Sequence, residues 1–580
     1  MPAVYHGKLK LWWCDECNLP LLTKKCEICN SIGRKIKITP PGDVRPAFAG
    51  DLKIINSLLE DRYGIDEGLR GVVLLNRLPA EDLAYEIIYC GRIIGILRYN
   101  GNFFDISLKP DGAEIFRKSI KKGYVVADEG AEDSLLSGRN LMAPGVVDIA
   151  DNVRKGMYVV VLCGNSVGVG ISKIDANNVP KKGVAVKMKG FKKIEDVNIC
   201  KNVGWEDVLR ANEKHLENLE KEAIEFIKRT AKEISLPILV SFSGGKDSMA
   251  TLLLVMKSGL KYESFFLDTG IELEETLRYV DDVEKRYGLK IKRIHSNDRF
   301  WKSLEKYGPP ARDYRWCCKV VKLGPTTKFI MENYPKGVLT FVGQRRYESD
   351  VRSKTPRIWR NKWVPNQIAA SPIQDWTALE VFLYLMKEKA PLNPWYERGM
   401  NRIGCYLCPS SDLGDFKIME KYSKILEKWF EYLEKYAREN DFPDYWISLG
   451  LWRWVNIPKR FGIKDIPEKR RIFSVRKKVE NGKVKFIPSR KINMERLKNL
   501  SFVLPEDCID LENLMSTKDC AENFLKIIYK VEECVGCGIC LAHCMFAALY
   551  IKNDMVWVNK QKCTKCMKCL EAMCPAVSWR

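Results

Sequence analysis

An apolar run that leads through glycines into a helical pattern marks the clearest element boundary in the chain. Ile238, Leu239 and Val240 precede the sequence Ser-Phe-Ser-Gly-Gly-Lys-Asp-Ser, and apolar residues then recur at helical spacing over 249–254. This order predicts a strand, a tight turn and a helix, as in one βα step of a parallel sheet. A second apolar run over 262–269 predicts a neighbouring strand. We therefore predict a multidomain α/β protein with a central doubly wound parallel sheet, whose ligand lies at the carboxyl edge of the strands.

The pattern of apolar residues changes upstream of this domain. Short apolar segments within residues 143–187 are separated by glycine turns, which predicts a small β-barrel. Residues 206–234 carry an apolar stripe among many charges, which predicts one long helix packed on the sheet. Residues 41–142 give a mixed α/β pattern without a motif that indicates chemistry.

Length and charge narrow the class of protein. A chain of 580 residues is too long for one hydrophobic core, so several domains are expected. No segment has the length of a membrane span and no signal-peptide pattern begins the sequence, which favours a cytoplasmic protein. The formal charge of +22 favours a polyanionic partner, nucleic acid first. Abundant Lys and Glu with scarce Gln is also typical of heat-adapted proteins, so both explanations of the charge stay open.

The 21 cysteines fall mostly in CxxC pairs, which indicates metal or iron–sulfur ligation in a reducing compartment. Two pairs near the N-terminus supply four thiolates, and this number suits a tetrahedral structural zinc ion. Rubredoxin-like iron uses similar spacing, and unligated thiols are the remaining alternative. The predicted zinc ligands are Cys14, Cys17, Cys26 and Cys29.

Two cysteine runs within residues 531–580 resemble a two-cluster bacterial ferredoxin domain. Their spacings are C-x2-C-x2-C-x3-C and C-x2-C-x2-C-x4-C-P, and Met545 stands where proline is usual. In that family the fourth cysteine of each run ligates the other cluster, and the clusters transfer electrons. The resemblance implies one [4Fe–4S] cluster at Cys534, Cys537, Cys540 and Cys574, and a second at Cys563, Cys566, Cys569 and Cys544.

The glycine turn after the first strand has the composition of a phosphate-binding loop, although the Walker A spacing is absent. Glycines bring the backbone close to an anion, and amides at a helix start together with hydroxyls and a lysine can hold its oxygens. The second strand ends in Asp-Thr-Gly at the same predicted edge. The predicted nucleotide-binding residues are Ser243, Gly244, Gly245, Lys246, Asp247, Ser248, Asp268, Thr269 and Gly270.

These residues carry a resemblance to a known family. SGGKDS followed by DTG resembles the pyrophosphatase loop of the adenine-nucleotide α-hydrolase fold, and later motifs are similar to the phosphoadenylyl-sulfate (PAPS) and adenylyl-sulfate (APS) reductase family. Those motifs are Cys317-Cys318, Gly343–Ser349, Ser371–Trp376 and Pro391–Cys405. The resemblance implies that Lys246, Lys322, Arg345, Arg346 and Arg352 face the anionic phosphosulfate or pyrophosphate. It also implies a third [4Fe–4S] cluster at Cys317, Cys318, Cys405 and Cys408.

The β-barrel segment resembles a PUA domain, a family that binds RNA in many modification enzymes. The order Pro-Gly-Val, then Asp148 and Asp151, then Lys155-Gly-Met-Tyr-Val-Val carries this resemblance. A basic cluster within residues 181–193 would suit RNA phosphates. The resemblance therefore implies tRNA or another RNA as a partner, and a role without RNA is the alternative.

One expected motif of the reductase family is missing. Its reductases carry a nucleophilic cysteine in a C-terminal Glu-Cys-Gly-x-His segment, and no such segment follows Cys408. Cys508 and Cys520 are the cysteines left in this half of the chain, but neither has an activating neighbour in the sequence.

The predicted organisation has six parts. They are a zinc knuckle (1–40), a mixed α/β segment (41–142), a PUA-like barrel (143–200), a PAPS reductase-like domain (201–440), a basic extension (441–505) and a ferredoxin-like domain (506–580). The leading hypothesis is an iron–sulfur oxidoreductase that reduces an adenylylated sulfur compound to sulfite with electrons from its own ferredoxin domain and an external donor. The alternatives are an ATP-dependent RNA sulfur-transfer enzyme and a non-catalytic electron-carrier or RNA-binding subunit.

Overall fold

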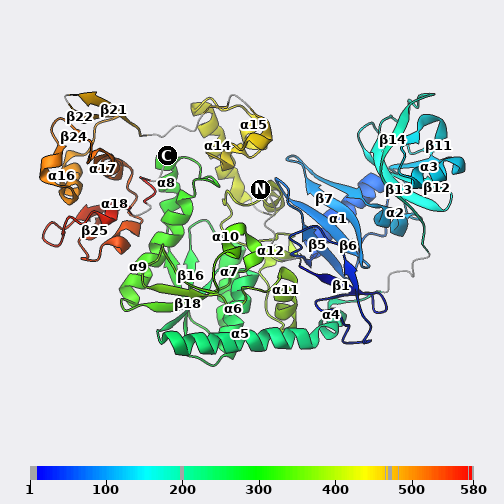
Figure 1. Ribbon diagram of the computed structural model, residues 1–580, viewed down its shortest axis with the longest axis horizontal. Helices are drawn as coiled ribbons and strands as arrows, with labels where there is room; N and C mark the ends of the chain where they lie inside the picture. The colour runs from blue at the N-terminus through cyan, green and yellow to red at the C-terminus, as the bar shows by residue number, and fades with distance from the viewer. Residues whose placement is uncertain are drawn as a thin grey trace.

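The chain is elongated and built of modules (Figure 1). The structure is a computed structural model that describes residues 9–195, 202–422, 424–463, 466–467, 473–480, 482–571 and 574–577. The C-terminal module and a β-barrel lie at opposite ends of the longest axis, with the central α/β domain between them. Over the described ranges, no helix has the length and apolar character that a membrane crossing needs.

The central sheet has the strand order β17-β16-β15-β18-β20-β19. All neighbouring strands are parallel except the edge strand β19, which is antiparallel to β20. The strand order reverses beside β15, so the loop after β15 lies where doubly wound sheets bind their ligands. The predicted fold class is confirmed. The strands are β15 (Ile238–Phe242), β16 (Glu263–Asp268), β17 (Ile291–His295), β18 (Val338–Val342), β19 (Ile358–Arg360) and β20 (Gln367–Ala370).

Helices cover both faces of this sheet. Helix α6 (Lys246–Lys257) packs on β15 and is buried along most of its length, which explains its run of apolar residues. Helices α5 (Glu213–Ile234) and α11 (Ala378–Lys387) pack against α6. Helices α7 (Glu274–Tyr287), α8 (Arg299–Tyr307) and α9 (Gly324–Asn333) complete the layers.

The long helix predicted over 206–234 is divided in two, which corrects the sequence-based expectation. Helix α4 (Trp205–Ala211) ends at Asn212, and α5 begins at the next residue. The Asn212 side chain donates to Pro20 O at 3.0 Å and accepts from the Leu22 amide at 2.7 Å. The break therefore anchors the N-terminal cysteine module to the central domain.

Over the described residues, two sheets precede the barrel. Strands β1 (Leu11–Cys14), β2 (Leu19–Leu21) and β3 (Arg34–Ile36) form the cysteine module. A five-stranded sheet of β4 (Arg45–Pro46), β5 (Val73–Arg77), β6 (Ala84–Tyr89), β7 (Arg92–Tyr99) and β8 (Phe104–Leu108) packs with α1 (Ala49–Tyr63) and α2 (Pro110–Phe116).

The barrel begins upstream of the expected boundary at 143, because β9 (Tyr124–Ala127) pairs with both β11 (Val146–Ile149) and β12 (Tyr158–Cys163). Strands β13 (Ser166–Ser172) and β14 (Val184–Lys193) continue it, with β10 (Leu141–Met142) at the edge. The expected boundary at 200 and 201 lies outside the described residues.

The C-terminal module contains residues from both the predicted basic extension (441–505) and the predicted ferredoxin-like domain (506–580). Strand β22 (Lys483–Pro488) pairs with β21 (Val475–Glu480) and, across the expected boundary, with β24 (Met515–Ser516). The short strand β23 (Ile509–Asp510) completes this sheet. Helices α16 (Met494–Leu500), α17 (Ala521–Glu533) and α18 (Lys568–Glu571) and the hairpin β25 (Leu549–Lys552)–β26 (Met555–Val558) surround the cysteines.

Candidate active site

The loop after β15 brings two serine hydroxyls and the start of α6 together. Ser248 Oγ donates to Gly245 O at 2.8 Å and accepts a hydrogen bond from the Ser243 amide at 3.1 Å. The two hydroxyl oxygens lie 3.1 Å apart. The Lys246 amide donates to the Tyr396 hydroxyl at 2.9 Å. Two hydroxyls and the start of α6 therefore lie together after β15, as in loops that hold phosphate oxygens.

Glycine is required at two close approaches around this loop. Gly244 has φ of 75°, and a Cβ there would lie 2.9 Å from Thr276 Cγ2. Gly343, at the end of β18, faces the backbone of Asp247 so closely that a Cβ would lie 2.4 Å from its carbonyl carbon. The loops that follow the parallel strands β15 and β18 are therefore in close contact at the edge of the sheet where ligands bind.

Asp247 is a mostly buried carboxylate, 15% exposed, that is held between two cations. Lys246 Nζ lies 2.7 Å from Asp247 Oδ2, and Arg345 Nε lies 2.7 Å from Oδ1. Burial alone would favour the neutral acid, but Lys246 and then Arg345 outweigh it and lower the pKa of Asp247 to about 2. Asp247 is therefore ionised at neutral pH and orients both cations.

Arg345 differs from its predicted role of facing an anionic ligand. Its side chain is buried, and its Nη1 also pairs with Asp43 at 3.0 Å. Two carboxylates already neutralise the guanidinium, which joins the loop, α6 and the N-terminal region. We correct the assignment of Arg345 from a ligand-facing to a positioning residue.

Arg346 and Arg352 lie nearer the surface. Arg346 Nε lies 2.5 Å from Asp375, and Arg352 pairs with Glu348 in the turn that follows. Both guanidinium groups are about one-third exposed, at 36% and 34% of the side chain. Exposed pairs of this kind are weak, so an anionic ligand could replace the carboxylates.

The Asp-Thr-Gly loop after β16 is the second part of the nucleotide edge. The Gly270 amide donates to Asp268 Oδ1 at 2.9 Å, and His295 Nδ1 lies 3.2 Å from Asp268 Oδ2. Gly270 has φ of 74°, and a Cβ there would meet Asn297 O at 2.2 Å. The loop is therefore fixed by its own carboxylate and glycine.

Thr269 connects this loop to the central cysteines. Its Oγ1 donates to Glu272 Oε1 at 2.7 Å and lies 3.6 Å from Cys405 Sγ. Cys405 Sγ in turn lies 3.6 Å from the same Glu272 oxygen. Burial raises the pKa of Glu272, while the charge of Lys322 acts in the opposite direction. Sequence reasoning missed Glu272, because one acid among several after the motif gives no signal.

The four central cysteines are brought together around a π-helical turn over Cys318–Leu323. The pKa of Cys317 is raised by its hydrogen bond with Cys318, by burial, and then by the charges of Cys318, Cys408 and Cys405. The same hydrogen bond lowers the pKa of Cys318 to about 5, against burial, with help from Arg315, Lys322 and Arg402. A π-helical turn is frequent at functional sites, and here it places adjacent cysteines beside a distant CxxC pair.

Lys322 is the cation of this site. Cys405 is the largest influence that raises the pKa of Lys322, burial opposes it, and Glu272, Cys318 and Cys408 raise it further. Lys322 is half-buried, and the groups that act on its ammonium are three central cysteines and Glu272. That Lys322 faces an anionic ligand stays a prediction.

The N-terminal thiols have the geometry of a single-ion site. The sulfur atoms of Cys14, Cys17, Cys26 and Cys29 all lie within 4.8 Å of one another. Four thiolates at that spacing fit tetrahedral zinc, and no position stays open for catalysis. Among the described residues, this is the one group of three or more such ligand atoms that lies this close together.

The C-terminal cysteines gather in two groups that combine both runs. The pKa of Cys537 is raised by burial and then by Cys574, Cys540 and Cys534. The pKa of Cys569 is raised by burial, and Cys544, Cys563 and Cys566 contribute to the increase. Each group offers four thiols, the ligand number of a [4Fe–4S] cluster. We refer to Cys534, Cys537, Cys540 and Cys574 as the inner set and to Cys544, Cys563, Cys566 and Cys569 as the outer set.

Lys530 on α17 lies between the inner and outer sets. It is only 3% exposed, its Nζ donates to Cys569 O at 2.6 Å, and no carboxylate pairs with it among the described residues. Its pKa is raised, despite burial, by Cys540, Cys574, Cys569 and Cys534. A buried ammonium needs compensating negative charge, and clusters ligated by thiolates supply it. The residues present therefore fit two anionic iron–sulfur clusters.

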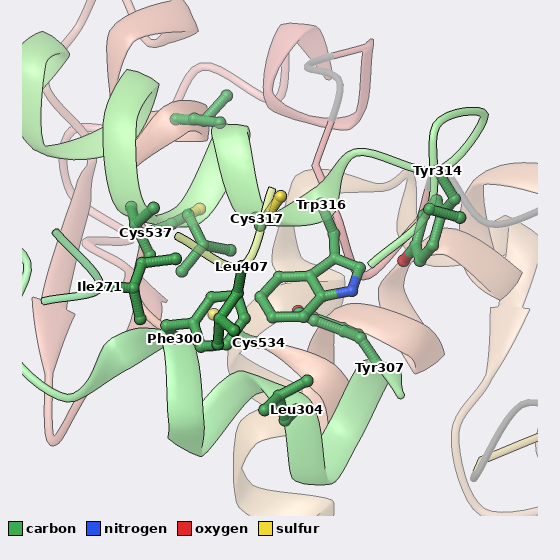
Figure 2. Close-up of a cluster of buried hydrophobic side chains, with 14 of the residues drawn as sticks. Ile271, Phe300, Leu304, Tyr307, Tyr314, Trp316, Cys317, Leu407, Cys534 and Cys537 are labelled. Carbon is green, nitrogen blue, oxygen red and sulfur yellow. The ribbon is translucent and has the colours of Figure 1, made fainter. Parts of the chain in front are cut away.

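The inner set packs directly on the central domain (Figure 2). Cys317, Cys534 and Cys537 belong to one buried cluster with Trp316, which stacks on Phe300 at 5.4 Å. A separate set of backbone contacts fixes the junction: Tyr307 donates to Glu533 O, Tyr314 donates to Pro575 O at 3.0 Å, and Lys306 donates to Cys534 O at 3.0 Å.

Two neighbouring residues of the π-helical turn reach the two cysteine sets. Cys318 belongs to the central set, while Lys319 lies near Cys574 and Cys537 of the inner set. Gly324 continues the contact, since a Cβ there would lie 2.0 Å from Cys537 O. Sequence patterns cannot reveal such a junction, because its residues are 213 apart along the chain, from 324 to 537.

Cys508 and Cys520 are paired in a disulfide with a Cα–Cα distance of 6.1 Å. Both lie in the C-terminal module, at the turn before β23 and the start of α17. In this state neither is a free thiol, and the structure does not bring either to the nucleotide loop. The candidate nucleophiles of the sequence analysis are therefore not part of the described site.

Comparisons with known proteins agree with this site. A family model for the phosphoadenosine phosphosulfate reductase domain matches residues 237–411. An uncharacterized protein of Methanocaldococcus jannaschii is 40% identical over 78% of this chain and 97% of its own length. A second uncharacterized protein of that organism is 30% identical over 71% of this chain and 94% of its own length. The adenosine 5'-phosphosulfate reductase of Allochromatium vinosum is 29% identical over 32% of this chain and 73% of its own length.

A model for the PUA domain matches residues 123–191, which agrees with the barrel that begins at β9. The fold, the ordered motifs and these matches define a nucleotide-binding α/β protein with an appended PUA domain. The chain belongs to the phosphoadenosine phosphosulfate reductase family.

Proposed function

We propose that the protein reduces an adenylylated sulfur compound, PAPS or APS, and releases sulfite. The main support for this proposal is a contact between the nucleotide loop and the central cysteines: Thr269 Oγ1 lies 3.6 Å from Cys405 Sγ. A nucleotide held by Ser243 and Ser248 would therefore have its sulfur end near the central set and Lys322. The similarity to APS reductases supports the same reaction.

The reaction needs two electrons. The bond between sulfur and the phosphate oxygen breaks, the oxygen leaves with the nucleotide, and the sulfur retains three oxygens as sulfite. In our proposal Lys322 stabilises the negative charge of the sulfonyl oxygens, as a preorganised cation does at a developing charge. Cys317, Cys318, Cys405 and Cys408 would hold a [4Fe–4S] cluster that supplies electron transfer at this point.

The C-terminal module is proposed as the electron source of the same chain. Its inner and outer sets would hold two clusters, and the inner set borders the π-helical turn of the central set. The absence of the family's Glu-Cys-Gly-x-His segment fits this proposal, because electrons that arrive through clusters do not require a thiol of the chain as the reductant.

A second candidate is ATP-dependent sulfur transfer to RNA, and the PUA domain favours it. The exposed residues Lys181, Lys182, Lys187 and Lys189 on the barrel would suit phosphates. Lys192 would not, because it pairs with Asp111 at 3.0 Å and with Glu114 at 2.9 Å.

Anaerobic binding of PAPS, APS and ATP to the cluster-loaded full chain, with and without tRNA, separates these functions. The reductase proposal predicts tight PAPS or APS binding and sulfite release on reduction with dithionite. A Lys322→Met variant should still bind nucleotide but lose most sulfite formation, whereas a Ser243→Ala/Ser248→Ala double variant should lose binding.

Two outcomes would contradict the reductase proposal. Preference for ATP, with pyrophosphate release only when tRNA is present, would establish RNA sulfur transfer instead. Nucleotide binding without any turnover would indicate a non-catalytic carrier. Ser258→Ala, at the far end of α6, is the matched control for the serine variants, since its hydroxyl bonds Val255 O within the helix end.

A further inference from the structure

The inner and outer cysteine sets differ in their access to solvent. All four inner cysteines are buried, with exposures between 6% and 8%. In the outer set Cys566 is exposed, and the other three are half-buried. The inner set also borders the central domain, whereas the outer set lies on the far side of Lys530. Electrons from outside the chain would therefore enter at the outer set.

The surface around the outer set has an apolar centre. Met545 and Phe546 directly follow Cys544 and are 73% and 45% exposed. Tyr550 on β25 is also exposed, at 43%. Large apolar side chains are seldom exposed as neighbours without a function, and such a patch is typical of a surface that another protein covers.

The segment that carries this apolar centre is rich in lysine. Residues 541–571 contain five lysines and only two carboxylates, Asp554 and Glu571. Lys568 Nζ lies 4.0 Å from Met545 Sδ, so positive charge lies at the rim of the apolar pair. Lys552, Lys560, Lys562 and Lys568 are exposed, and Lys565 pairs with Glu506.

We propose that this surface, Met545, Phe546, Cys566 and the four exposed lysines, is the docking site of a small acidic one-electron carrier protein. Complementary charge steers the encounter and fixes its orientation, while the apolar pair excludes water where the partners touch. The exposed Cys566 lies within this surface, where a carrier's own redox centre could approach the outer set. This inference rests on the proposed electron-transfer role of the C-terminal module.

The test measures reduction of the module itself and not sulfite formation. The cluster-loaded full chain is mixed anaerobically, without nucleotide, with an acidic two-cluster bacterial ferredoxin that has been reduced and freed of dithionite. Stopped-flow absorbance then follows cluster bleaching at several salt concentrations. We expect a rate that falls steeply with salt and about a tenfold loss of rate in Lys562→Glu/Lys568→Glu, the scale of electrostatic steering.

The matched control is Lys477→Glu/Lys483→Glu, which makes the same charge change on the β21–β22 hairpin of the same module. Figure 1 shows this hairpin at the opposite side of the module from β25 and α18. The control should retain the wild-type rate with the carrier, and both double variants should be bleached equally fast by dithionite alone.

Three results would overturn the docking site. Equal slowing of both double variants would show a nonspecific effect of net charge. A salt-independent rate would exclude an electrostatic encounter. Loss of tRNA binding in Lys562→Glu/Lys568→Glu with an unchanged carrier rate would show that this surface binds RNA. If sulfite is never formed but carrier-dependent bleaching follows the prediction, the proposed substrate is wrong and the docking site stands.

Discussion

At the scale of single residues, the structure separates buried side chains that hold the loop from side chains near the surface. Arg345 and Arg346 are adjacent in one motif, and sequence reasoning gave them the same role. Arg345 is buried against two carboxylates, and Arg346 lies near the surface beside Asp375. The difference depends on Asp43, which is 302 residues away and gives no local signal.

Replacing Arg345 should therefore lower the free energy of unfolding more than replacing Arg346 does. Arg345→Gln leaves the mostly buried carboxylates of Asp43 and Asp247 with too little positive charge, and breaking a buried pair typically costs about 3–5 kcal/mol. Arg346→Gln removes a half-exposed pair and should cost less than about 1 kcal/mol. Thermal or denaturant unfolding of the central domain compares the two variants, and equal losses would contradict the positioning role of Arg345.

The position of Lys530 predicts an effect on the midpoint potentials of the two proposed clusters. Lys530→Met keeps an apolar stem but removes the positive charge between the inner and outer sets. Reduction adds negative charge to a cluster, so the midpoint potentials of both clusters should fall when the cation is lost. Redox titration followed by electron paramagnetic resonance measures this. Lys526→Met, on the same helix but beside Glu522, should leave the potentials unchanged.

At the scale of elements, patterns predicted the strands and the cysteine sets, but not how elements meet. The βα step at 238–254 was predictable because periodicity and glycines act locally. The break at Asn212 and the junction at Gly324 depend on contacts with distant segments, and nothing in the adjacent sequence marks them.

Gly324→Ala tests the junction. The new methyl group would lie 2.0 Å from Cys537 O, so the C-terminal module must shift away from the π-helical turn. We expect nucleotide binding to be kept while electron transfer from the module to the central set slows. Freeze-quenched electron paramagnetic resonance follows this step. Lys328→Ala, on the exposed face of the same helix, is the control, and normal transfer in Gly324→Ala would disprove the route.

The start of α13 (Leu413–Glu420) predicts a pH effect. Asp415 accepts from the Asp412 amide at 3.1 Å, and burial, with the charge of Asp412, raises the pKa of Asp415 to about 7. The folded-state pKa of Asp415 exceeds the unfolded value of 3.8. Ionisation of Asp415 therefore costs no stability below about pH 4, and its cost to the free energy of unfolding grows as the pH rises towards 7.

Asp415→Asn should remove this dependence. The difference in melting temperature between variant and wild type should increase from pH 5 to pH 7.5, and the underlying free energy is on the order of 3 kcal/mol. Differential scanning fluorimetry across this range provides the measurement. Parallel curves for the two proteins would show that Asp415 is ionised throughout.

At the scale of the whole molecule, the central domain and the C-terminal module share one hydrophobic core, and polar contacts between distant residues add to the attachment of the modules. Sequence motifs identified the family and the barrel, because each depends on the order and spacing of short segments, and the ligand sets of the cysteines stay predictions. Their arrangement along one axis was not predictable, since the fastening residues Asn212, Asp43 and Lys306 lie outside every motif.

The N-terminal cysteine module should stabilise the central domain to which it is attached. Removing its metal with a chelator should lower the melting temperature of the N-terminal and central regions together, because Asn212 joins β2 to the break between α4 and α5. Cys29→Ser should have the same effect without a chelator. Elemental analysis before and after treatment identifies the metal, and an unchanged melting temperature after its removal would show that the module is stable without it.

The π-helical turn has a consequence for control. Cys318 and Lys319 are successive residues, so one turn adjoins both the central set and the inner set. The contact with the inner set is non-covalent, so in the proposed electron route a movement of the C-terminal module away from the turn would open the circuit. The junction is then a third place, besides the surface where the carrier docks and the loop where the nucleotide arrives, at which the current would start or stop.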